Sequence, residues 1–314
     1  MLQLPYFPFN EDTFKLTMGV QALLDDSLIE IDGESYQDEL KLKHTLLSDE
    51  YDQYFRTLPG TEPLQWDVLA LLLTNMAYRY PQHFALNNSD GDHWTWHNRL
   101  LNEKTTFIFG ERDSLALPAL DWLGRQVQED LLLLDGSVAS GMSLVAGHLC
   151  FPNAWCLDDK IGQSFLDIHQ PVPLFSQYLG RPTSLLLERL KVGRPVWRVN
   201  WSIKATSRLN LMPRFFYEEE QAYQDFTLEN IGERCFLRLE RQTLSRLPYT
   251  NAILFTIRTY QAPIVTVVNN ANYARRIAAT VRTMPEEVLS YKGIRPFRNI
   301  LLDYLTSASH LNGM

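Results

Sequence analysis

The chain has 314 residues, of which 45% are hydrophobic and 21% are charged, and its formal net charge is −8. This length allows a large core in one or two domains, and the acidic balance argues against nucleic acid as a partner. No apolar run approaches the roughly 18 residues that span a bilayer, and the first residues lack the basic and apolar regions of a signal peptide. The three cysteines form no CxxC pair, so we expect a cytoplasmic protein with neither a zinc site nor a four-cysteine iron–sulfur cluster.

Residues 1–129 are predicted to be mainly helical and to pack on the rest of the chain. Apolar side chains recur at helical spacing over residues 39–55 and, nearly all round, over residues 64–80, which predicts a buried helix there. His93 and His97 have the spacing of a metal-binding pair on a helix. Their Gly, Asp and Trp neighbours instead favour a turn or a strand edge, so we expect no metal site there.

Residues 130–262 predict a sheet that is interrupted by a helical insert. Apolar runs around an Asp-Gly turn predict two strands, and three further segments alternate between apolar and polar residues. These five strands are expected at residues 130–136, 144–151, 196–203, 234–243 and 252–260. The segment between the second and third strands, 152–194, has Gly and Pro breaks and helical pieces. Residues 263–314 are expected to add C-terminal helices, and all three regions are expected to form one compact unit.

Two strands, a helical insert and three strands are the order of a PAS domain, in which helices lie across one face of a five-stranded antiparallel sheet. We therefore predict an α+β fold with a PAS-like core and helical extensions at both ends. Haem-binding PAS domains carry their ligand histidine in the insert, where His169 lies within FLDIHQPVPLF. Residue chemistry alone favours a core histidine bonded to backbone. His148, in a strand beside small residues, is the main rival as a ligand.

Ionisable side chains lie in the otherwise apolar strands. They are Arg198, Arg238, Glu240, Arg241 and Arg258. Burying an ion without a partner is costly, so these groups should be paired or should face a cavity. In the first case Glu240 pairs with an arginine across the sheet and fastens it. In the second case an arginine could bind a haem propionate or hydrogen-bond to dioxygen, and Glu240 could accept a hydrogen bond from a bound ammonium group.

Standard motifs for other cofactors are absent from the sequence. It contains no GxGxxG, P-loop, HExxH or GxSxG pattern, so a flavin or nicotinamide site within the chain has no support.

Four stretches of the sequence resemble the haem-dependent oxidative N-demethylase family, of the haem-binding alpha-subunit type. They are RLERQTLSRLPYTNAILFTIRTY at 238–260, AWCLDDKIGQSFLDIHQPVP at 154–173, VWRVNWSI at 196–203 and MGVQALLDDSLIEID at 18–32. The resemblance thus runs from near residue 5 to beyond residue 260.

The resemblance implies a PAS-like subunit that holds haem b, with its iron, through a histidine. Members use dioxygen to remove a methyl group from a secondary amine such as dimethylamine, releasing formaldehyde and a primary amine. Their electrons come from NADPH through a separate flavin and iron–sulfur reductase, which agrees with the missing motifs. A haem-based gas sensor and a non-catalytic haem or small-molecule binding protein are the alternatives, although no output domain is recognisable.

The iron ligand implied by the resemblance is His169, the histidine of the matching block. The expected cofactor contacts are His169, Trp155, Lys160, Pro171, Arg241 and Arg258, and the expected catalytic residues are Glu240, Arg198 and Arg258. The strand arginines and Glu240 are placed around the pocket from strand faces, not from the resemblance. Arg198 or Arg258 would stabilise bound dioxygen, and Glu240 would orient the amine.

Overall fold

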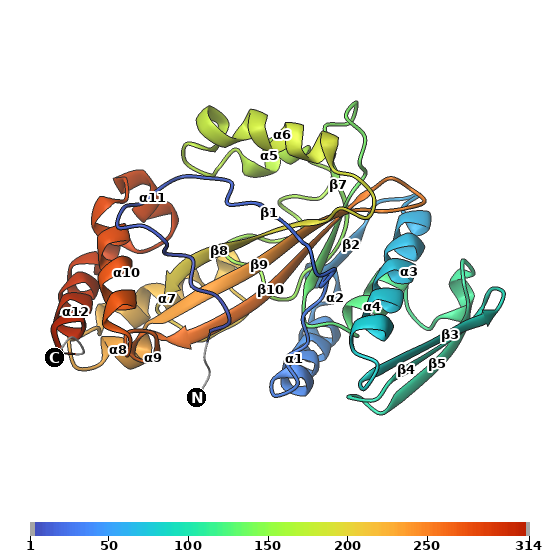
Figure 1. Ribbon diagram of the computed structural model, residues 1–314, viewed down its shortest axis with the longest axis horizontal. Helices are drawn as coiled ribbons and strands as arrows, with labels where there is room; N and C mark the ends of the chain where they lie inside the picture. Colours follow the sequence, from blue (N-terminus) through green and yellow to red (C-terminus); the bar gives the residue numbers. More distant parts are fainter. Residues whose placement is uncertain (1–3, 312–314) are drawn as a thin grey trace.

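The computed structural model describes residues 4–311, which form an α+β fold with two antiparallel sheets (Figure 1). The large sheet has seven strands, which are, in spatial order, β1 (Gln21–Ala22), β8 (Val196–Lys204), β9 (Phe236–Arg246), β10 (Ile253–Pro263), β6 (Asp130–Leu134), β7 (Leu144–His148) and β2 (Phe55–Thr57). The small sheet consists of β3 (Phe84–Asp90), β4 (His93–Asn98) and β5 (Glu103–Ile108). All five predicted strands are present, but two short edge strands from the N-terminal region extend the predicted five-stranded sheet to seven.

The helices surround the large sheet and continue beyond one end of it (Figure 1). They are α1 (Tyr36–Asp49), α2 (Tyr51–Tyr54), α3 (Glu62–Arg79), α4 (Ala119–Gly124), α5 (Phe165–His169), α6 (Gly180–Arg189), α7 (Phe216–Gln224), α8 (Ile231–Arg234), α9 (Ile264–Val267), α10 (Ala271–Thr283), α11 (Glu286–Tyr291) and α12 (Arg298–Leu311). The predicted buried helix is α3, which ends before Pro81 because a residue that precedes proline is disfavoured in helical conformation. Across residues 4–311, none of the helices combines the length and apolar character needed to cross a bilayer.

The N-terminal region contains a sheet as well as helices. The segment with His93 and His97 was expected to be a turn or a strand edge; it forms β4, the central strand of the small sheet, and is not a helix. Residues four apart along a strand are separated by about 13 Å, too far to share one metal ion. The two histidines therefore cannot form the metal pair that their spacing would allow on a helix.

The two faces of the large sheet carry different residues, because neighbours in register share a face. Asn200 on β8 pairs with Glu240 on β9, which pairs with Thr259 on β10. The next residues along, Arg241 and its partner Arg258, point to the opposite face. Helices α1, α3 and α4 and, farther along, α10 and α12 pack on that opposite face.

The helical insert between β7 and β8 covers the other face of the sheet, which we call the insert face. It consists of α5, the short helix η2 (Phe175–Leu179) and α6, and it lies across the top of the sheet in Figure 1. Phe165, Phe175 and Leu187 of the insert form an apolar cluster with Leu132 and Ile257 of the sheet. The insert is thus anchored over β6 and β10, which brings His169 to the insert face.

Candidate functional site

His169 is the last residue of α5, and its ring is held in one orientation. Its Nδ1 lies 2.8 Å from the carbonyl oxygen of Phe165, one helical turn earlier. A carbonyl can only accept, so Nδ1 carries the proton and Nε2 keeps a free lone pair. Among the residues described, nothing hydrogen-bonds to Nε2. Metal-binding histidines characteristically donate one ring N–H to a backbone or carboxylate oxygen in this way.

Two aromatic rings and the local charge keep the His169 imidazole fixed and neutral. Phe175 stacks on it with ring centroids 4.7 Å apart, and Phe165 lies at 4.4 Å. Burial, together with the positive charges of Lys160 and Arg198, lowers the pKa of His169 to about 4, although the hydrogen bond to Phe165 opposes this shift. A neutral imidazole is the form that binds a metal, so no proton competes with a ligand at pH 7.

Three other residues of the same block have different environments. Lys160 donates a hydrogen bond of 2.5 Å to the carbonyl of Ile168, next to His169. Trp155 is half-buried against the apolar cluster of the insert, and Pro171 is exposed just after α5. Lys160 therefore contacts the backbone that carries the histidine, while Trp155 and Pro171 shape the segment around it.

Glu240 lies at the centre of a polar cluster on the insert face. Its carboxylate accepts hydrogen bonds from the side-chain amides of Asn153 at 3.0 Å, Asn200 at 3.2 Å and Gln242 at 3.1 Å. The guanidinium of Arg238 lies 3.5 Å away on the same strand. Burial raises the pKa of Glu240, but Arg238 and the amides outweigh burial and hold it below its usual range. A buried, ionised carboxylate thus faces the same side of the sheet as His169.

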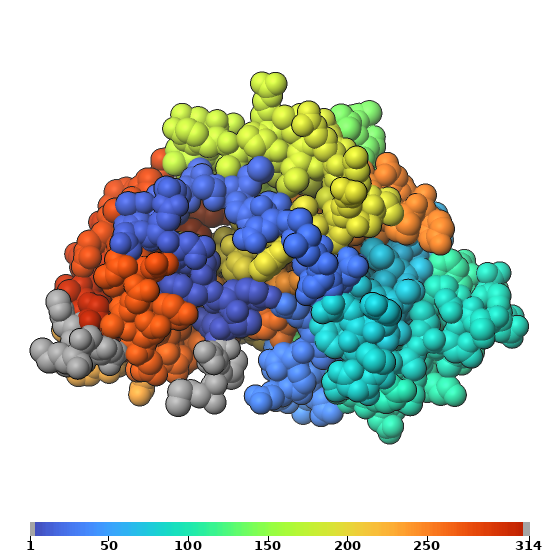
Figure 2. All heavy atoms as spheres, in the orientation of Figure 1, coloured from blue at the N-terminus to red at the C-terminus, as the bar shows by residue number. Residues whose placement is uncertain are grey.

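Some side chains at the centre of the insert face are only partly buried. Gln242, Leu244 and Phe255 lie on the two central strands and point toward the insert, yet each remains partly exposed. Figure 2 shows an opening in the surface between the N-terminal segment, in blue, and the yellow β8 strand. Arg198 lines this region: it donates to the carbonyl of Met18 at 3.2 Å, while its buried Nε has no partner among the described residues. Partly exposed side chains and this surface opening therefore lie between the insert and the polar cluster.

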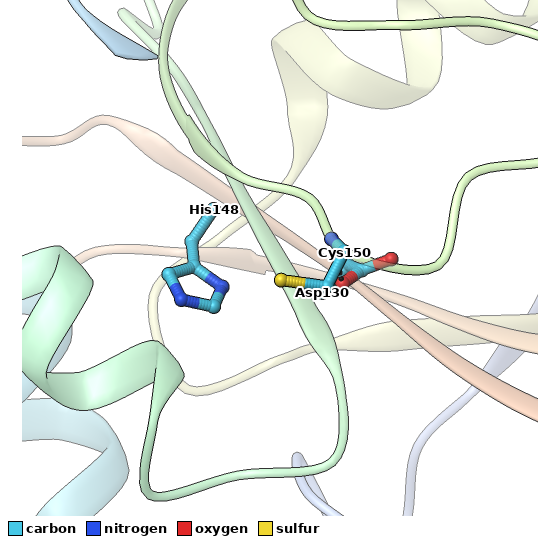
Figure 3. A group of neighbouring side chains, drawn as sticks. All are labelled: Asp130, His148 and Cys150. Atoms are coloured by element: carbon cyan, nitrogen blue, oxygen red, sulfur yellow. Dashed lines mark hydrogen bonds between the residues drawn. The ribbon is translucent and has the colours of Figure 1, made fainter. Parts of the chain in front are cut away.

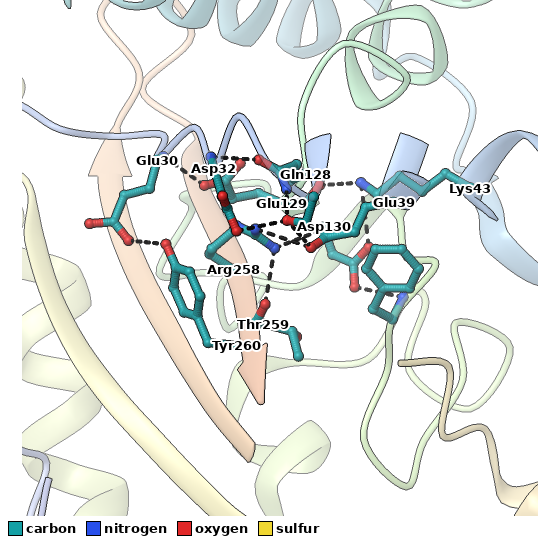
Figure 4. Close-up of polar contacts among 12 residues, drawn as sticks. Glu30, Asp32, Glu39, Lys43, Gln128, Glu129, Asp130, Arg258, Thr259 and Tyr260 are labelled. Carbon is teal, nitrogen blue, oxygen red and sulfur yellow. Dashed lines mark hydrogen bonds and ion pairs between the residues drawn. The ribbon is translucent and has the colours of Figure 1, made fainter. Parts of the chain in front are cut away.

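Arg241 and Arg258 lie on the opposite face, so the sheet separates them from His169. Arg258 makes a two-pronged ion pair with Glu39 of α1, at 2.6 and 3.2 Å (Figure 4). Arg241 lies 3.2 Å from Glu30 and donates to the carbonyl of Ser27. The structure does not bring these two arginines to the candidate site; they fasten the N-terminal segment and α1 to the sheet. The physical reason is the alternation of side chains along a strand, which sends Glu240 and Arg241 to different sides.

A second group of possible ligands surrounds His148, the rival histidine. Asp130, His148 and Cys150 are fully buried and their ligand atoms lie within 4.8 Å of one another, with the sulfur directed toward the imidazole (Figure 3). The carboxylate of Asp130 already accepts two backbone N–H bonds, at 2.8 and 2.9 Å, and the Nζ of Lys43 lies 3.8 Å away. Burial raises the pKa of the Cys150 thiol, which stays neutral.

This second group fits a packed core rather than a cation site. Lys43 already supplies the positive charge that Asp130 needs, and a further cation would be repelled by it. A Cβ at Gly124 would lie 2.4 Å from the His148 ring, so the imidazole is packed directly against the backbone of α4. His148 therefore behaves as a core histidine.

The sequence singled out Arg238, which pairs with Glu240, but not the amide partners of this carboxylate. Asn200 shares the polar face of β8 with Arg198 and could have been found from that alternation, whereas Asn153 comes from a loop. Lys292, which follows α11, donates to the carbonyl of Trp201 at 2.6 Å. Burial lowers the pKa of Lys292 to about 8, and Glu240 opposes this shift. No local pattern marks Asn153 or Lys292, because the fold alone brings them to the cluster.

The fold and this site define an α+β protein in which a neutral histidine and an ionised, buried carboxylate face one side of a single sheet. Residues 19–302 match the family model described as haem-dependent oxidative N-demethylase, alpha subunit-like. The match covers most of the chain, and the protein belongs to this family. The resemblance predicted from the sequence is thus confirmed, and with it a relation to haem-dependent oxidoreductases.

Proposed function

We propose that this protein is the haem-binding subunit of a monooxygenase that oxidatively removes a methyl group from a small secondary amine, such as dimethylamine. The observation that carries the proposal is the state of His169, which is neutral, held through Nδ1 and, among the described residues, without a hydrogen bond at Nε2. Family membership supports the haem and the class of reaction. One oxygen atom of dioxygen would leave in formaldehyde and the other in water, with two electrons from NADPH.

On this proposal, the five central strands and the insert form a PAS-like haem-binding core over residues 130–262. Numbered along the chain, these strands lie in the spatial order 2-1-5-4-3, and the helical insert follows the second strand. The N-terminal region, 1–129, and the C-terminal helices, 263–314, would then be extensions packed on this core.

The residues present fit a histidine-held haem b. His169 would bind the iron through Nε2, with the Phe165 carbonyl fixing the ring from behind. Arg198, whose buried Nε lacks a partner among the described residues, would bind a propionate or another polar ligand. When bound, haem supplies the activation of dioxygen and the oxidation of the N-methyl group.

The polar cluster would bind and orient the amine. A secondary amine is a cation near pH 7, and the ionised carboxylate of Glu240 can accept hydrogen bonds from its N–H groups. The amides of Asn153 and Asn200 hold that carboxylate in place. Positioning the methyl group in this way contributes to the rate by removing orientational freedom before the reaction.

Electrons would reach this subunit from a separate flavin and iron–sulfur reductase that uses NADPH. The sequence has no dinucleotide-binding motif, and Cys150, Cys156 and Cys235 are too few for a four-cysteine cluster. All three cysteines are free thiols, which fits a reducing compartment such as the cytoplasm.

Absorption spectra of the purified protein test the iron ligand. His169→Ala is expected to abolish or greatly weaken haem binding, whereas His83→Ala, at a histidine outside the insert, should leave the Soret band unchanged. Wild-type protein titrated with dimethylamine should show a spectral shift and release formaldehyde when supplied with NADPH and a reductase. A His169→Ala variant with a fully retained, unshifted Soret band would exclude this ligand assignment.

A haem-based gas sensor or a non-catalytic binding protein is the second candidate. It is favoured by the strand order and by Arg198, a hydrogen-bond donor suited to a bound diatomic gas. Stable dioxygen binding with no formaldehyde release in the presence of amine and reductant would decide for the sensor.

A further inference from the structure

The outer side of the helical insert carries a local excess of positive charge. Four exposed cations lie on α6 and the turn that follows it, against the single carboxylate of Glu188, in a chain with a net charge of −8. We call these cations the insert patch, which consists of Arg181, Arg189, Lys191 and Arg194. None of them is in an ion pair with any carboxylate of the described residues. Like charges on one ten-residue helix and the turn after it repel one another, and a partner of opposite charge would relieve that repulsion.

The turn at one end of the patch presents an apolar residue among the cations. The backbone N–H of Arg194 donates to the carbonyl of Lys191 at 3.1 Å, and Gly193 adopts the positive φ of +70° that this turn requires. Val192 at the tip is 51% exposed. An apolar centre with a polar, charged rim is the usual anatomy of a protein–protein interface.

The patch is held rigidly on the sheet. The buried guanidinium of Arg246, on β9, donates to the carbonyls of Leu187 and Leu190 at the C-terminal end of α6. The same guanidinium donates to the carbonyl of Asn251, in the turn between β9 and β10, at 2.9 Å. A surface that is already ordered loses little conformational entropy when a partner binds.

The insert connects this outer surface directly to His169. Phe175 stacks on the His169 ring, and η2 continues without a break into α6, where Arg181 begins the patch. A Cβ at Gly180 would lie 3.6 Å from the side chain of Leu166, so α5 and α6 are in close contact. The insert therefore carries the candidate iron ligand at the end of α5 and the exposed cations on α6 and the turn after it; α5 and α6 lie at the top of Figure 1.

We propose that the insert patch is the docking surface for an acidic electron-donor protein, an inference that rests on the proposed function. Opposite charges steer association and orient the partner, and here they would bring a donor to the layer that carries His169. The net charge of −8 disfavours a membrane or a nucleic acid as the occupant, since both are uniformly anionic over areas much larger than the patch.

Plant-type ferredoxin, a small acidic iron–sulfur protein, is a suitable probe. Its affinity for the wild-type chain, measured by isothermal titration calorimetry at low salt, should fall about ten-fold or more in the R189E/K191E variant. K41E/K104E reverses two exposed cations outside the insert and should leave the affinity unchanged. In haem-loaded protein, the rate of haem reduction by ferredoxin should fall in R189E/K191E and stay at the wild-type value in K41E/K104E. The rate of reduction by dithionite should be the same in all three proteins. Salt at 200 mM should weaken wild-type binding.

The outcomes separate this inference from the proposed function. Loss of ferredoxin binding in R189E/K191E, in protein that fails to bind haem, would show that the patch binds an acidic protein but would overturn both the proposed function and the role in electron transfer. Equal affinity in wild type and variant, or no wild-type binding in protein that does bind haem, would overturn the docking surface alone. Binding of wild-type protein to phosphatidylglycerol vesicles that is lost in R189E/K191E would assign the patch to a membrane and also overturn the proposal.

Discussion

Replacing Arg258 with Met should destabilise the protein without changing its haem environment. The side chain is 1% exposed and neutralises Glu39 through two hydrogen bonds, while its charge also stabilises the buried Glu129. Removing one member of a buried ion pair costs about 3–5 kcal/mol, because the other charge stays buried without a partner. For 314 residues the unfolding entropy is about 0.65 kcal/mol/K, so the melting temperature should fall by roughly 5–8 °C.

Urea unfolding and thermal melting measure this loss, and absorption spectra measure the haem environment. Arg275→Met, which breaks an exposed ion pair with Asp12, is the matched control and should cost less than about 1 kcal/mol. The double variant E39M/R258M should be more stable than R258M, because it also removes the Glu39 carboxylate that R258M leaves buried without a partner. A stable R258M protein with a lost or shifted Soret band would refute the assignment of Arg258 to the structural face.

Two further predictions concern buried groups on either side of the sheet. Burial raises the pKa of Glu129 from 4.5 to about 7, so the folded state binds its proton more tightly; stability should therefore fall by up to about 3 kcal/mol as the pH rises from 4.5 to 7. Urea unfolding across this range should show a smaller change of unfolding free energy with pH in Glu129→Gln than in wild type. An equal pH dependence would contradict the raised pKa of Glu129. Lys160→Met removes the hydrogen bond to the Ile168 carbonyl, and loss of such support for a ligand should weaken haem retention about ten-fold. The rate of haem transfer to apomyoglobin measures this retention. A rate equal to that of wild type would show that Lys160 does not position His169.

The sheet centre could be predicted from the sequence because its strands are long and regular. Strands β8, β9 and β10 have nine to eleven residues each, and their alternation gave boundaries within a few residues of the structure. Strands β1 and β2 have two and three residues, too few to show any periodicity, so the sheet was predicted two strands too narrow. Strand β3, with the sequence FALNNSD, is polar along most of its length, which hid the small sheet from a pattern-based prediction.

The candidate site was predictable only in part, because sequence shows alternation within a strand but not register between strands. His169 could be placed in the insert, and the structure puts it on the face to which Arg198 and Glu240 also point. Arg258 could have belonged to either face until its pairing with Arg241 was known. The register between β9 and β10 thus placed Arg258 in a structural ion pair and not near the candidate cofactor site.

The two faces of the sheet differ in how their buried carboxylates are partnered. On the opposite face, Glu39 is matched by the two-pronged bond from Arg258. On the insert face, Glu240 accepts hydrogen bonds from three neutral amides, and Arg238, at 3.5 Å, also donates to two backbone carbonyls. The charges of Arg198, Lys204 and Lys292 also act on Glu240. On the proposed function, an ammonium group would compete mainly with neutral amides for Glu240 but with a guanidinium for Glu39, which is why the insert face suits such a substrate better.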